Sequence, residues 1–328
     1  MNTEFVKYLF NSGGNIEDLS LLLNYAYHSK LDIPGNELDN FPFTIDKGSR
    51  WDFREMKEIC LYRFLGYPLV AMRGLENLPS CRDEFPVGRL YKYFKDIDSK
   101  YTEFEILKKS GEIRTVAAPD KFLKKVLRTL NIALWHVIEV SVHAHGFISE
   151  RSIRTNAELH TNKNYVLNVD IENFFPSVKY SRVKKELKGD HLKLKGSFAH
   201  IIAKFCCFKG GLPQGAPTSP LITNLICLNM DQVLALFAQK HKQVFTRYAD
   251  DITFSGYRPV YDKQFFGELN RIIKKEDFKL KYSKTRIQSK NKRQEVTGVV
   301  VNDKLNLNRK YIRNLRAMIH HYKSGKEM

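Results

Sequence analysis

The feature that most restricts the fold of this chain is a pair of adjacent aspartates, Asp250-Asp251. They stand between two short runs of β-type residues, Val244-Phe245-Thr246 and Ile252-Thr253-Phe254. Side chains alternate between the two faces of a strand, so neighbouring aspartates within one strand would point in opposite directions. At the tip of a tight hairpin, both carboxylates can face one site. A lone Asp-Asp pair is more often a solvated turn, so the pair alone predicts a hairpin and no chemistry.

A third aspartate changes this interpretation. Asp170 ends another apolar, strand-like run, Val166-Leu167-Asn168-Val169. Three carboxylates at two strand ends could hold two divalent metal ions about 3.5–4 Å apart, the arrangement that activates an attacking oxygen and stabilises a leaving one. The sequence therefore predicts a metal centre for phosphoryl transfer at the end of a small sheet.

The charge of the chain points to a polyanionic partner. The 328 residues hold 54 Lys and Arg against 36 Asp and Glu, a net charge of +18, with 12% aromatic residues. The charge is clustered, since residues 271–293 carry ten Lys or Arg against two acids, Glu276 and Asp277. Nucleic acid is the first candidate for such a surface. The length is enough for two or three subdomains with sizeable cores.

Cysteine usage and hydropathy predict a soluble, cytoplasmic protein without a membrane partner. The five cysteines form no CxxC pair, which is typical of buried thiols in a reduced, intracellular protein. Glu4 and Lys7 interrupt the apolar residues of the N-terminus, so we expect no secretory signal. Residues 210–230 carry no charge, but three prolines within them argue against a membrane helix.

The first hundred residues have a helical pattern and no clear chemistry. Asn15 is placed to cap a helix with acids in its first turn, and a second helix is predicted from Asp52 to Leu65, ending at Gly66. A small helical cap is the preferred interpretation, with a contact surface for RNA or a protein partner as the alternative. A hairpin over residues 101–117 follows and carries Arg114, which could bind a triphosphate or be a surface charge. The helix after it begins at Asp120.

Two further stretches could shape a pocket near the aspartates. Phe174 and Phe175 follow Asp170; in extended chain one ring would anchor the core while the other floors a pocket beside Asp170. A ring in that place would collide with a ribose 2′-hydroxyl and favour deoxynucleotides. The loop of residues 210–220 offers Gln214, and its glycines allow close approach of a ligand. We expect Ser219 to cap one long helix after this loop, with its apolar stripe running on through Val233, Leu236 and Phe237.

Other basic and polar residues have two interpretations each. Lys284, on a predicted strand of residues 280–287, could protonate a leaving pyrophosphate or be a surface lysine. The basic segment of residues 182–195 could follow a nucleic-acid backbone or be a solvated helix. Asn156 and His160 lie one helical turn apart and could face one way, or could be a capping residue and a core or surface histidine. Residues 309–322 form a predicted amphipathic helix whose Arg313 and Arg316 are available for phosphates.

The ordered set of motifs resembles reverse transcriptases over about residues 100–300. The elements that carry this resemblance are Asp170 with Phe174-Phe175, Leu212-Pro213-Gln214-Gly215, Tyr248-Ala249-Asp250-Asp251 and Ser283-Lys284-Thr285. Asn156-Ala157-Glu158-Leu159-His160 and Val296-Thr297-Gly298 are similar to the NAxxH and VTG elements of bacterial retron reverse transcriptases. Each motif is weak by itself, and the order of the set is specific.

The resemblance implies an α+β fold, a right-hand polymerase of fingers, palm and partial thumb. The expected parts are a helical N-terminal region (1–100), fingers (101–168), a palm (169–300) with a fingers insertion near 181–209, and the start of a thumb (301–328). Family members usually have a fuller thumb and a shorter N-terminal region. We therefore expect either that the chain is truncated or that a partner supplies the missing thumb contacts.

The resemblance also implies roles for individual residues. Asp170, Asp250 and Asp251, with the Ile171 carbonyl, are expected to bind two Mg²⁺ ions, and Lys284 to act near the leaving group. The dNTP pocket is expected to comprise Arg114, Phe175 as steric gate, Gln214 and Ala249. The expected nucleic-acid contacts are Arg151, Asn156, His160, Val296, Thr297, Gly298, Arg313 and Arg316.

A retron enzyme would copy part of a structured noncoding RNA, which supplies template and primer. Synthesis would start from a guanosine 2′-hydroxyl and give a branched RNA–DNA hybrid (msDNA), in an antiphage defence system with an effector protein. Two alternatives stay open at this point. The chain could be a non-retron bacterial reverse transcriptase, such as a group II intron type, or mainly a scaffold that holds RNA–DNA and the effector.

Overall fold

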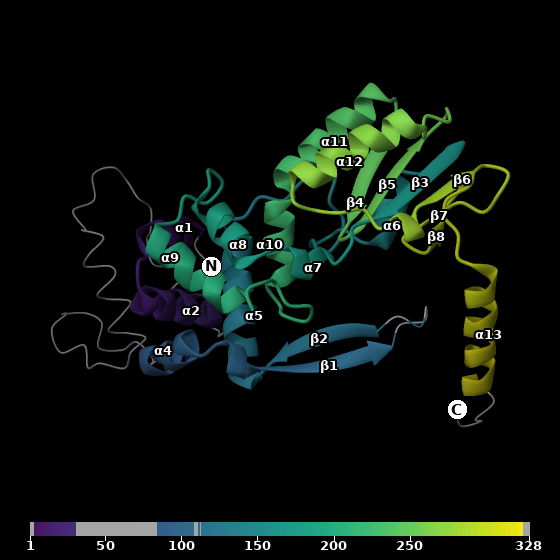
Figure 1. Cartoon of the computed structure of the whole chain (residues 1–328). Helices are drawn as coiled ribbons and strands as arrows, with labels where there is room; N and C mark the ends of the chain where they lie inside the picture. The colour runs from purple at the N-terminus through teal and green to yellow at the C-terminus, as the bar shows by residue number, and fades with distance from the viewer. Residues whose placement is uncertain (1–2, 31–83, 108–110, 112, 324–328) are drawn as a thin grey trace. The chain divides into compact units, whose positions relative to one another are not determined.

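The computed structural model describes residues 3–30, 84–107, 111 and 113–323 (Figure 1). The chain forms two compact units, one of Met1–Glu139 with Val178–Leu225 and one of Val140–Ser177 with Ile226–Met328. These units divide the chain differently from the expected domains. Residues 140–168, expected in the fingers, belong to the second unit because Ala144 pairs with Arg247 and His160 bonds to Thr246.

Helices α1 (Thr3–Ser12), α2 (Ile16–Lys30), α4 (Val87–Lys95) and α5 (Lys121–Trp135) belong to the first unit. The predicted cap of α2 is confirmed, since Asn15 Oδ1 accepts a hydrogen bond from Asp18 N at 2.9 Å. Leu19, Leu22 and Leu23 of this helix are fully buried. The predicted helix of residues 52–65 lies outside the described residues.

The hairpin of the first unit follows the one-turn helix η1 (Asp98–Lys100) and consists of β1 (Tyr101–Leu107) and β2 (Ile113–Pro119). The strands are antiparallel, with Tyr101 opposite Pro119 at the base. The expected turn of residues 109–112 lies mostly outside the described part. Asp120 caps α5 as predicted, because its side chain accepts from Leu123 N at 2.8 Å.

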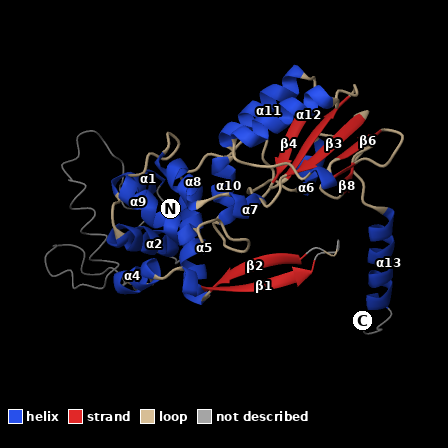
Figure 2. Cartoon of the chain, in the orientation of Figure 1, coloured by secondary structure: helices blue, strands red, loops and turns tan. Residues whose placement is uncertain are grey.

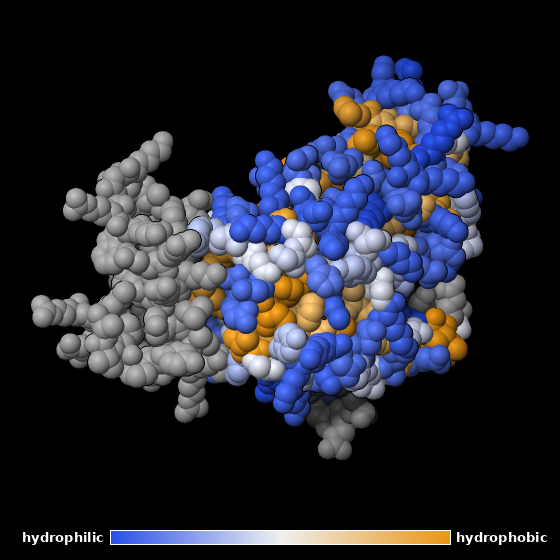
Figure 3. All heavy atoms as spheres, turned by 60° about the vertical axis from the view of Figure 1, so that its left-hand side comes forward, coloured by the Kyte–Doolittle hydropathy of each residue, from blue (hydrophilic) through white to orange (hydrophobic). Residues whose placement is uncertain are grey.

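The first unit also contains α8 (Tyr180–Lys188), α9 (Gly196–Cys206) and the start of α10 (Ser219–Ile226). Helix α8 buries Val183 and Leu187 and leaves Lys185 and Lys188 exposed. The basic segment is therefore an amphipathic helix up to Lys188 and has no helix from residue 189 to 195. The surface view shows mostly hydrophilic side chains around smaller apolar areas (Figure 3).

The second unit is built on a four-stranded antiparallel sheet with the order β4-β5-β3-β6 (Figure 2). The strands are β3 (Tyr165–Asp170), β4 (Val244–Tyr248), β5 (Asp251–Gly256) and β6 (Arg286–Ser289). Helices α11 (Leu228–Lys240) and α12 (Lys263–Lys275) pack together beside the sheet. Phe254 of β5 joins them, with its ring centroid 5.9 Å from that of Phe237 and 5.6 Å from that of Phe265.

The prediction of one long helix after residue 218 is wrong. The helix breaks at Cys227 into α10 and α11, which are bent by 53°. Past the break the buried face is that of Leu234 and Phe237, while Val233 and Leu236 are 45% and 67% exposed. Ser219 is also not a cap, because it is the first residue of α10 and its hydroxyl donates to Pro213 O at 2.8 Å.

The remaining elements of the second unit are short, apart from the last helix. They are α6 (Ile153–Glu158), α7 (Phe174–Ser177), η2 (Tyr282–Lys284), the hairpin β7 (Glu295–Val296) with β8 (Val299–Val300), and α13 (Arg309–Lys323). Helix α13 forms as predicted, but it buries none of its residues.

Two findings concern membrane helices and cysteines. In the described part of the chain no single helix is long and apolar enough to cross a membrane. The bent pair of α10 and α11 together has the length and composition of a membrane span. Cys206, Cys207 and Cys227 are free thiols and are buried.

Candidate active site

The three aspartates lie at one end of the sheet. Asp170 is the last residue of β3, Asp251 is the first residue of β5, and the two are opposite each other in the strand register. Asp250 lies in the turn between β4 and β5, and its carbonyl accepts from Ile171 N at 3.0 Å. The hairpin predicted from the sequence is therefore present, and it brings Asp251 next to Asp170.

A buried ion pair supports the turn that carries Asp250. Arg247 and Asp231 are both fully buried and form two contacts, Nε to Oδ1 at 2.7 Å and Nη2 to Oδ2 at 2.8 Å. Arg247 Nη1 also donates to Ala249 O at 3.1 Å. Ala249 has a φ of 56°, in the left-handed region that non-glycine residues rarely adopt. Arg247 thus links α11 to the strained residue next to Asp250.

Lys284 reaches the carboxylates from a one-turn helix rather than from the expected strand. It ends η2, just before β6 begins at Arg286. Its Nζ lies 2.7 Å from Asp170 Oδ2. Burial opposes the charged form, but the hydrogen bond to Asp170 and the charges of Asp170, Asp250 and Asp251 raise the pKa of Lys284 above its usual value. All three carboxylates therefore act on one ammonium group.

The carboxyl group of Asp251 has an unusual affinity for protons. Burial, and then the negative charges of Asp250 and Asp170, raise its pKa to about 6, against the smaller opposing effect of Lys284 and Arg286. Three carboxylates held close together repel one another, and a bound cation relieves that repulsion. The site is therefore built to gain from binding positive charge.

The donor set suits a hard divalent cation. Carboxylate and backbone carbonyl oxygens are the ligands that Mg²⁺ prefers. No group of three metal-ligating side chains is already arranged around a metal position in the described ranges. The Lys284 ammonium contacts Asp170 in this arrangement. The residues fit a divalent metal by their chemistry, while the geometry of such a centre is not preformed.

Of the two phenylalanines after Asp170, one ring is buried and the other is partly exposed, as expected. They do not lie in extended chain, however. Both lie in the short helix α7, which follows Asn173 with its φ of 47°. Phe174 is buried, with its ring centroid 5.5 Å from that of Phe278. Phe175 is half-buried and lies against Phe174, with a centroid distance of 5.4 Å. The helical turn, rather than strand alternation, separates the core ring from the partly exposed one.

Arg114 and Gln214 belong to the first unit. Arg114 is exposed on β2, opposite Ile106. Gln214 is half-buried, and its carbonyl accepts from Ala117 N of the same strand at 2.8 Å. Gly215 has a φ of 118°, and a Cβ there would lie 2.8 Å from Ala117 O. The loop of Gln214 is thus held against β2.

Asn156 and His160 are buried, which argues against direct contact with nucleic acid. His160 is fully buried, and its ring nitrogens lie 2.6 Å from Ser255 Oγ and 2.7 Å from Thr246 Oγ1. Burial, and then the charges of His145 and Lys163, lower its pKa to about 3, so the ring is neutral at pH 7. The ring therefore joins α6 to the sheet.

The two motifs that resemble retron elements meet in the structure. Asn156 Nδ2 donates to Thr297 Oγ1 at 3.4 Å, across 141 residues of sequence. Val296 is buried, so it packs in the core, while Gly298 is exposed. Thr297 and Gly298 have φ values of 47° and 83°, which make the β7–β8 connection a tight turn. In the two motifs Glu158, Leu159 and Gly298 are exposed and Thr297 is half-buried, so these residues are accessible to a partner.

The arginines expected to bind nucleic acid differ in their surroundings. Arg151 is half-buried, and its Nη1 donates to Ala144 O and, at 2.7 Å, to Ser141 O. Arg313 and Arg316 are exposed on α13. Arg151 therefore stabilises a loop, whereas Arg313 and Arg316 remain accessible.

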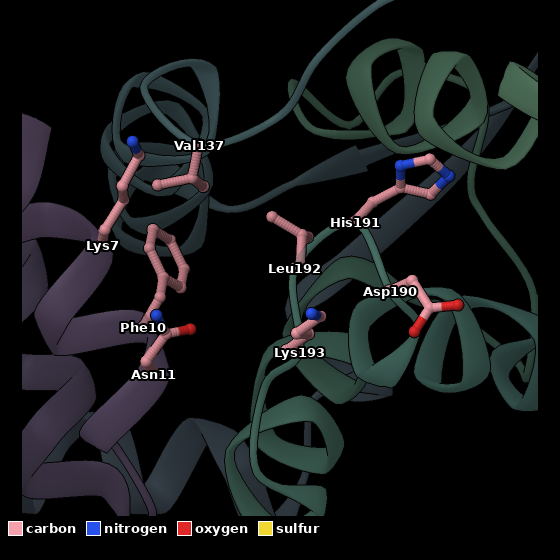
Figure 4. Close-up of a pocket in the computed structure, with 8 residues that line it drawn as sticks. All are labelled: Lys7, Phe10, Asn11, Val137, Asp190, His191, Leu192 and Lys193. Atoms are coloured by element: carbon pink, nitrogen blue, oxygen red, sulfur yellow. The ribbon is translucent and has the colours of Figure 1, made fainter.

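One pocket of about 250 Å³ belongs to the first unit (Figure 4). It is lined by residues of α1, by Val137 and by residues 190–193 between α8 and α9. None of the candidate site residues lines it.

Comparison with known proteins agrees with these motifs. Residues 106–301 match the family model "Reverse transcriptase (RNA-dependent DNA polymerase)". The chain is 33% identical to the Retron Ec86 reverse transcriptase of Escherichia coli, over 80% of this chain and 82% of that protein. The chain belongs to the retron reverse transcriptases. The right-hand polymerase fold expected from the motifs is thereby confirmed.

Other similar proteins match this chain over a smaller part of their own length. The Retron Mx65 reverse transcriptase of Myxococcus xanthus is 35% identical over 67% of this chain, and the match spans only 55% of that protein. A solved telomerase from Candida tropicalis, in complex with a fragment of telomeric RNA, has a TM-score of 0.46 at 11% identity and covers 78% of this chain and 55% of its own. The reverse transcriptase family in general depends on divalent metal ions.

Some residues that build the site of this reverse transcriptase were not identified from its sequence. Arg247 was the most visible of them, because a charged residue in the short apolar run Val244–Tyr248 signals a buried partner. Its partner Asp231 lies on a helix with no distinguishing motif. Phe147, whose ring centroid is 6.3 Å from that of Phe175, gave no signal beyond the preceding glycine.

Proposed function

We propose that this chain is the RNA-directed DNA polymerase of a retron. It copies part of a structured noncoding RNA, starting from a guanosine 2′-hydroxyl, and produces a branched RNA–DNA molecule (msDNA) for antiphage defence. The observation that carries the proposal is the meeting of Asp170 with Asp251 across β3 and β5, with Lys284 Nζ 2.7 Å from Asp170. The retron relatives favour this assignment over a group II intron type.

The reaction is an in-line attack of the primer hydroxyl on the α-phosphorus of a dNTP, with pyrophosphate leaving. Such reactions depend mainly on positioning and on neutralising charge. Asp170, Asp250, Asp251 and the Ile171 carbonyl would hold two Mg²⁺ ions, which supply positive charge to the phosphates when bound. Lys284 carries a raised pKa and stays protonated at neutral pH, so it can donate a proton to the leaving pyrophosphate.

In this proposal Phe175, Ala249, Arg114 and Gln214 contact the dNTP. Phe175 is half-buried beside the end of β3 and excludes a ribose 2′-hydroxyl. Ala249 is buried in the catalytic turn, and its role would be to shape the dNTP pocket. Arg114 is exposed and can bind the triphosphate in a bidentate manner. Gln214 is half-buried and offers a polar side chain to the dNTP.

The direct test is primer extension on an RNA template with dNTPs and Mg²⁺. Asp250→Asn should abolish extension while RNA binding is retained, because the amide cannot replace the carboxylate charge. Asp303→Asn, the same exchange at an exposed aspartate of the second unit, serves as the matched control and should stay active. Extension by Asp250→Asn at the wild-type rate would refute the assignment.

The retron assignment needs its own test. Nucleic acid purified with the protein should be a branched RNA–DNA of one discrete sequence, resistant to debranching unless a 2′,5′-specific enzyme is present. A heterogeneous RNA population would contradict the retron assignment, although the chain could still be an RNA-directed DNA polymerase. The effector protein belongs to the same proposal: protection by an Asp250→Asn variant supplied with ready-made msDNA would indicate that this chain also holds the effector.

A further inference from the structure

The loop of His145, Gly146 and Phe147 is fixed to the catalytic turn. His145 N donates to Arg247 O at 2.7 Å. A Cβ on Gly146 would lie 2.6 Å from Ala249 N, so any side chain there would push the turn away. The position of Phe147 is thus tied to the backbone that carries Asp250.

Phe147 is held in an unfavourable conformation that folding alone does not explain. Its φ is 61°, in the left-handed region where a bulky aromatic residue is an outlier. Its side chain is 51% exposed, so burial of the ring offers little compensation. Residues strained in this way cluster at functional sites, where neighbouring structure holds them.

The ring of Phe147 lies next to two aromatic rings of the candidate site. Its centroid is 6.3 Å from that of Phe175 and 6.5 Å from that of Tyr248, with both pairs tilted. These separations lie within the range in which aromatic pairs attract each other. Phe175 also contacts Phe174, which is anchored in the core against Phe278. Phe175 therefore has a core contact through Phe174 and a second contact through Phe147.

We propose that Phe147 is a positioning residue for sugar selection, holding the Phe175 ring where it excludes ribonucleotides. This inference rests on the proposed role of Phe175 as the gate. Without the Phe147 ring, Phe175 keeps only its contact with Phe174 among these rings and can rotate away from the sugar. Ribonucleotides then enter while the carboxylates stay in place.

The test is Phe147→Gly, which removes the side chain while the left-handed backbone stays free of strain, because glycine adopts that conformation readily. Single-nucleotide incorporation of dGTP and rGTP on an RNA template gives kcat/KM for each sugar. Discrimination against rGTP should fall roughly 2- to 12-fold, which corresponds to one aromatic pair. The fall should come from a higher kcat/KM for rGTP, and the melting temperature should not decrease. Phe147→Tyr should restore wild-type discrimination.

The double variant separates this inference from the proposed function. In a Phe175→Ala background, Phe147→Gly should not change discrimination further. If Phe175→Ala itself leaves discrimination unchanged, the gate assignment fails, and this inference with it. If Phe175→Ala lowers discrimination but Phe147→Gly does not, this inference alone is overturned. An equal loss of kcat/KM for both sugars in Phe147→Gly would also overturn it, because the ring would then contact primer or template instead.

Discussion

The buried pair of Arg247 and Asp231 offers a test of how the catalytic turn is held. Both side chains are 0% exposed and share two short contacts. Removing one partner leaves a buried charge without compensation, which costs about 3–5 kcal/mol. Asp231→Asn or Arg247→Met should therefore lower the melting temperature by on the order of 10 °C. Chemical unfolding followed by circular dichroism measures the free energy of unfolding directly.

The double variant Arg247→Met/Asp231→Leu separates stability from positioning. Replacing both members of a buried ion pair by apolar residues of similar volume is often neutral or stabilising, so most of the lost stability should return. Activity should not return. Ala249 O would lose the donor that lies 3.1 Å away, at a residue with a φ of 56° next to Asp250. Primer extension should stay at least tenfold below wild type.

Two outcomes would refute this reasoning. Single variants that cost less than about 1 kcal/mol would show that the pair is not a desolvated ion pair. A double variant that is stable and extends primers at the wild-type rate would show that the turn does not need Arg247. The matched control is Lys240→Met, which breaks an exposed ion pair with Glu268 and should change neither property.

Four further predictions concern the site and its surroundings. The apparent affinity for Mg²⁺ should weaken as pH falls below about 6, because the Asp251 carboxyl has a pKa of about 6 and must be ionised to bind a cation. The Mg²⁺-induced shift of the melting temperature, measured at several values between about pH 5 and about pH 7.5, tests this prediction. The same raised pKa means that the metal-free protein should lose stability as pH rises from about 4 to 6, where the folded state holds a proton that the unfolded state has released. His160→Leu should cost about 1–3 kcal/mol for each hydroxyl left unpaired, without changing the salt dependence of RNA binding. The double variant Arg313→Ala/Arg316→Ala should change RNA binding and leave stability unchanged. It should reduce the slope of log K against log salt by about 1–2. A slope equal to that of wild type would show that neither arginine contacts RNA.

Local patterns predicted the elements of this fold well, because their causes lie within a few residues. Asn15 and Asp120 cap the helices that they precede, since a cap needs only the first turn of its own helix. The hairpin at Asp250-Asp251 was visible from alternation and turn chemistry. The prediction of one helix after residue 218 was wrong, because the pattern of apolar residues did not show the bend at Cys227.

The candidate site was only partly visible from the sequence. The order of motifs placed Asp170, Asp250, Asp251 and Lys284 in one site, and the structure brings them together. The exposure of side chains was harder to predict. Asn156 and His160 were expected to contact nucleic acid, yet both are buried, because their partners lie on strands and turns far along the chain.

The sequence by itself determined the chemistry: three carboxylates at strand ends, a basic chain, and motifs in the order of a reverse transcriptase. Tertiary structure alone decided how that chemistry is held. His160 bonds to residues 86 and 95 positions away, Asn156 to one 141 positions away, and Phe147 lies against Phe175. The physical reason is that burial and ring contacts depend on which distant segments pack together, and no local period of the sequence encodes that choice.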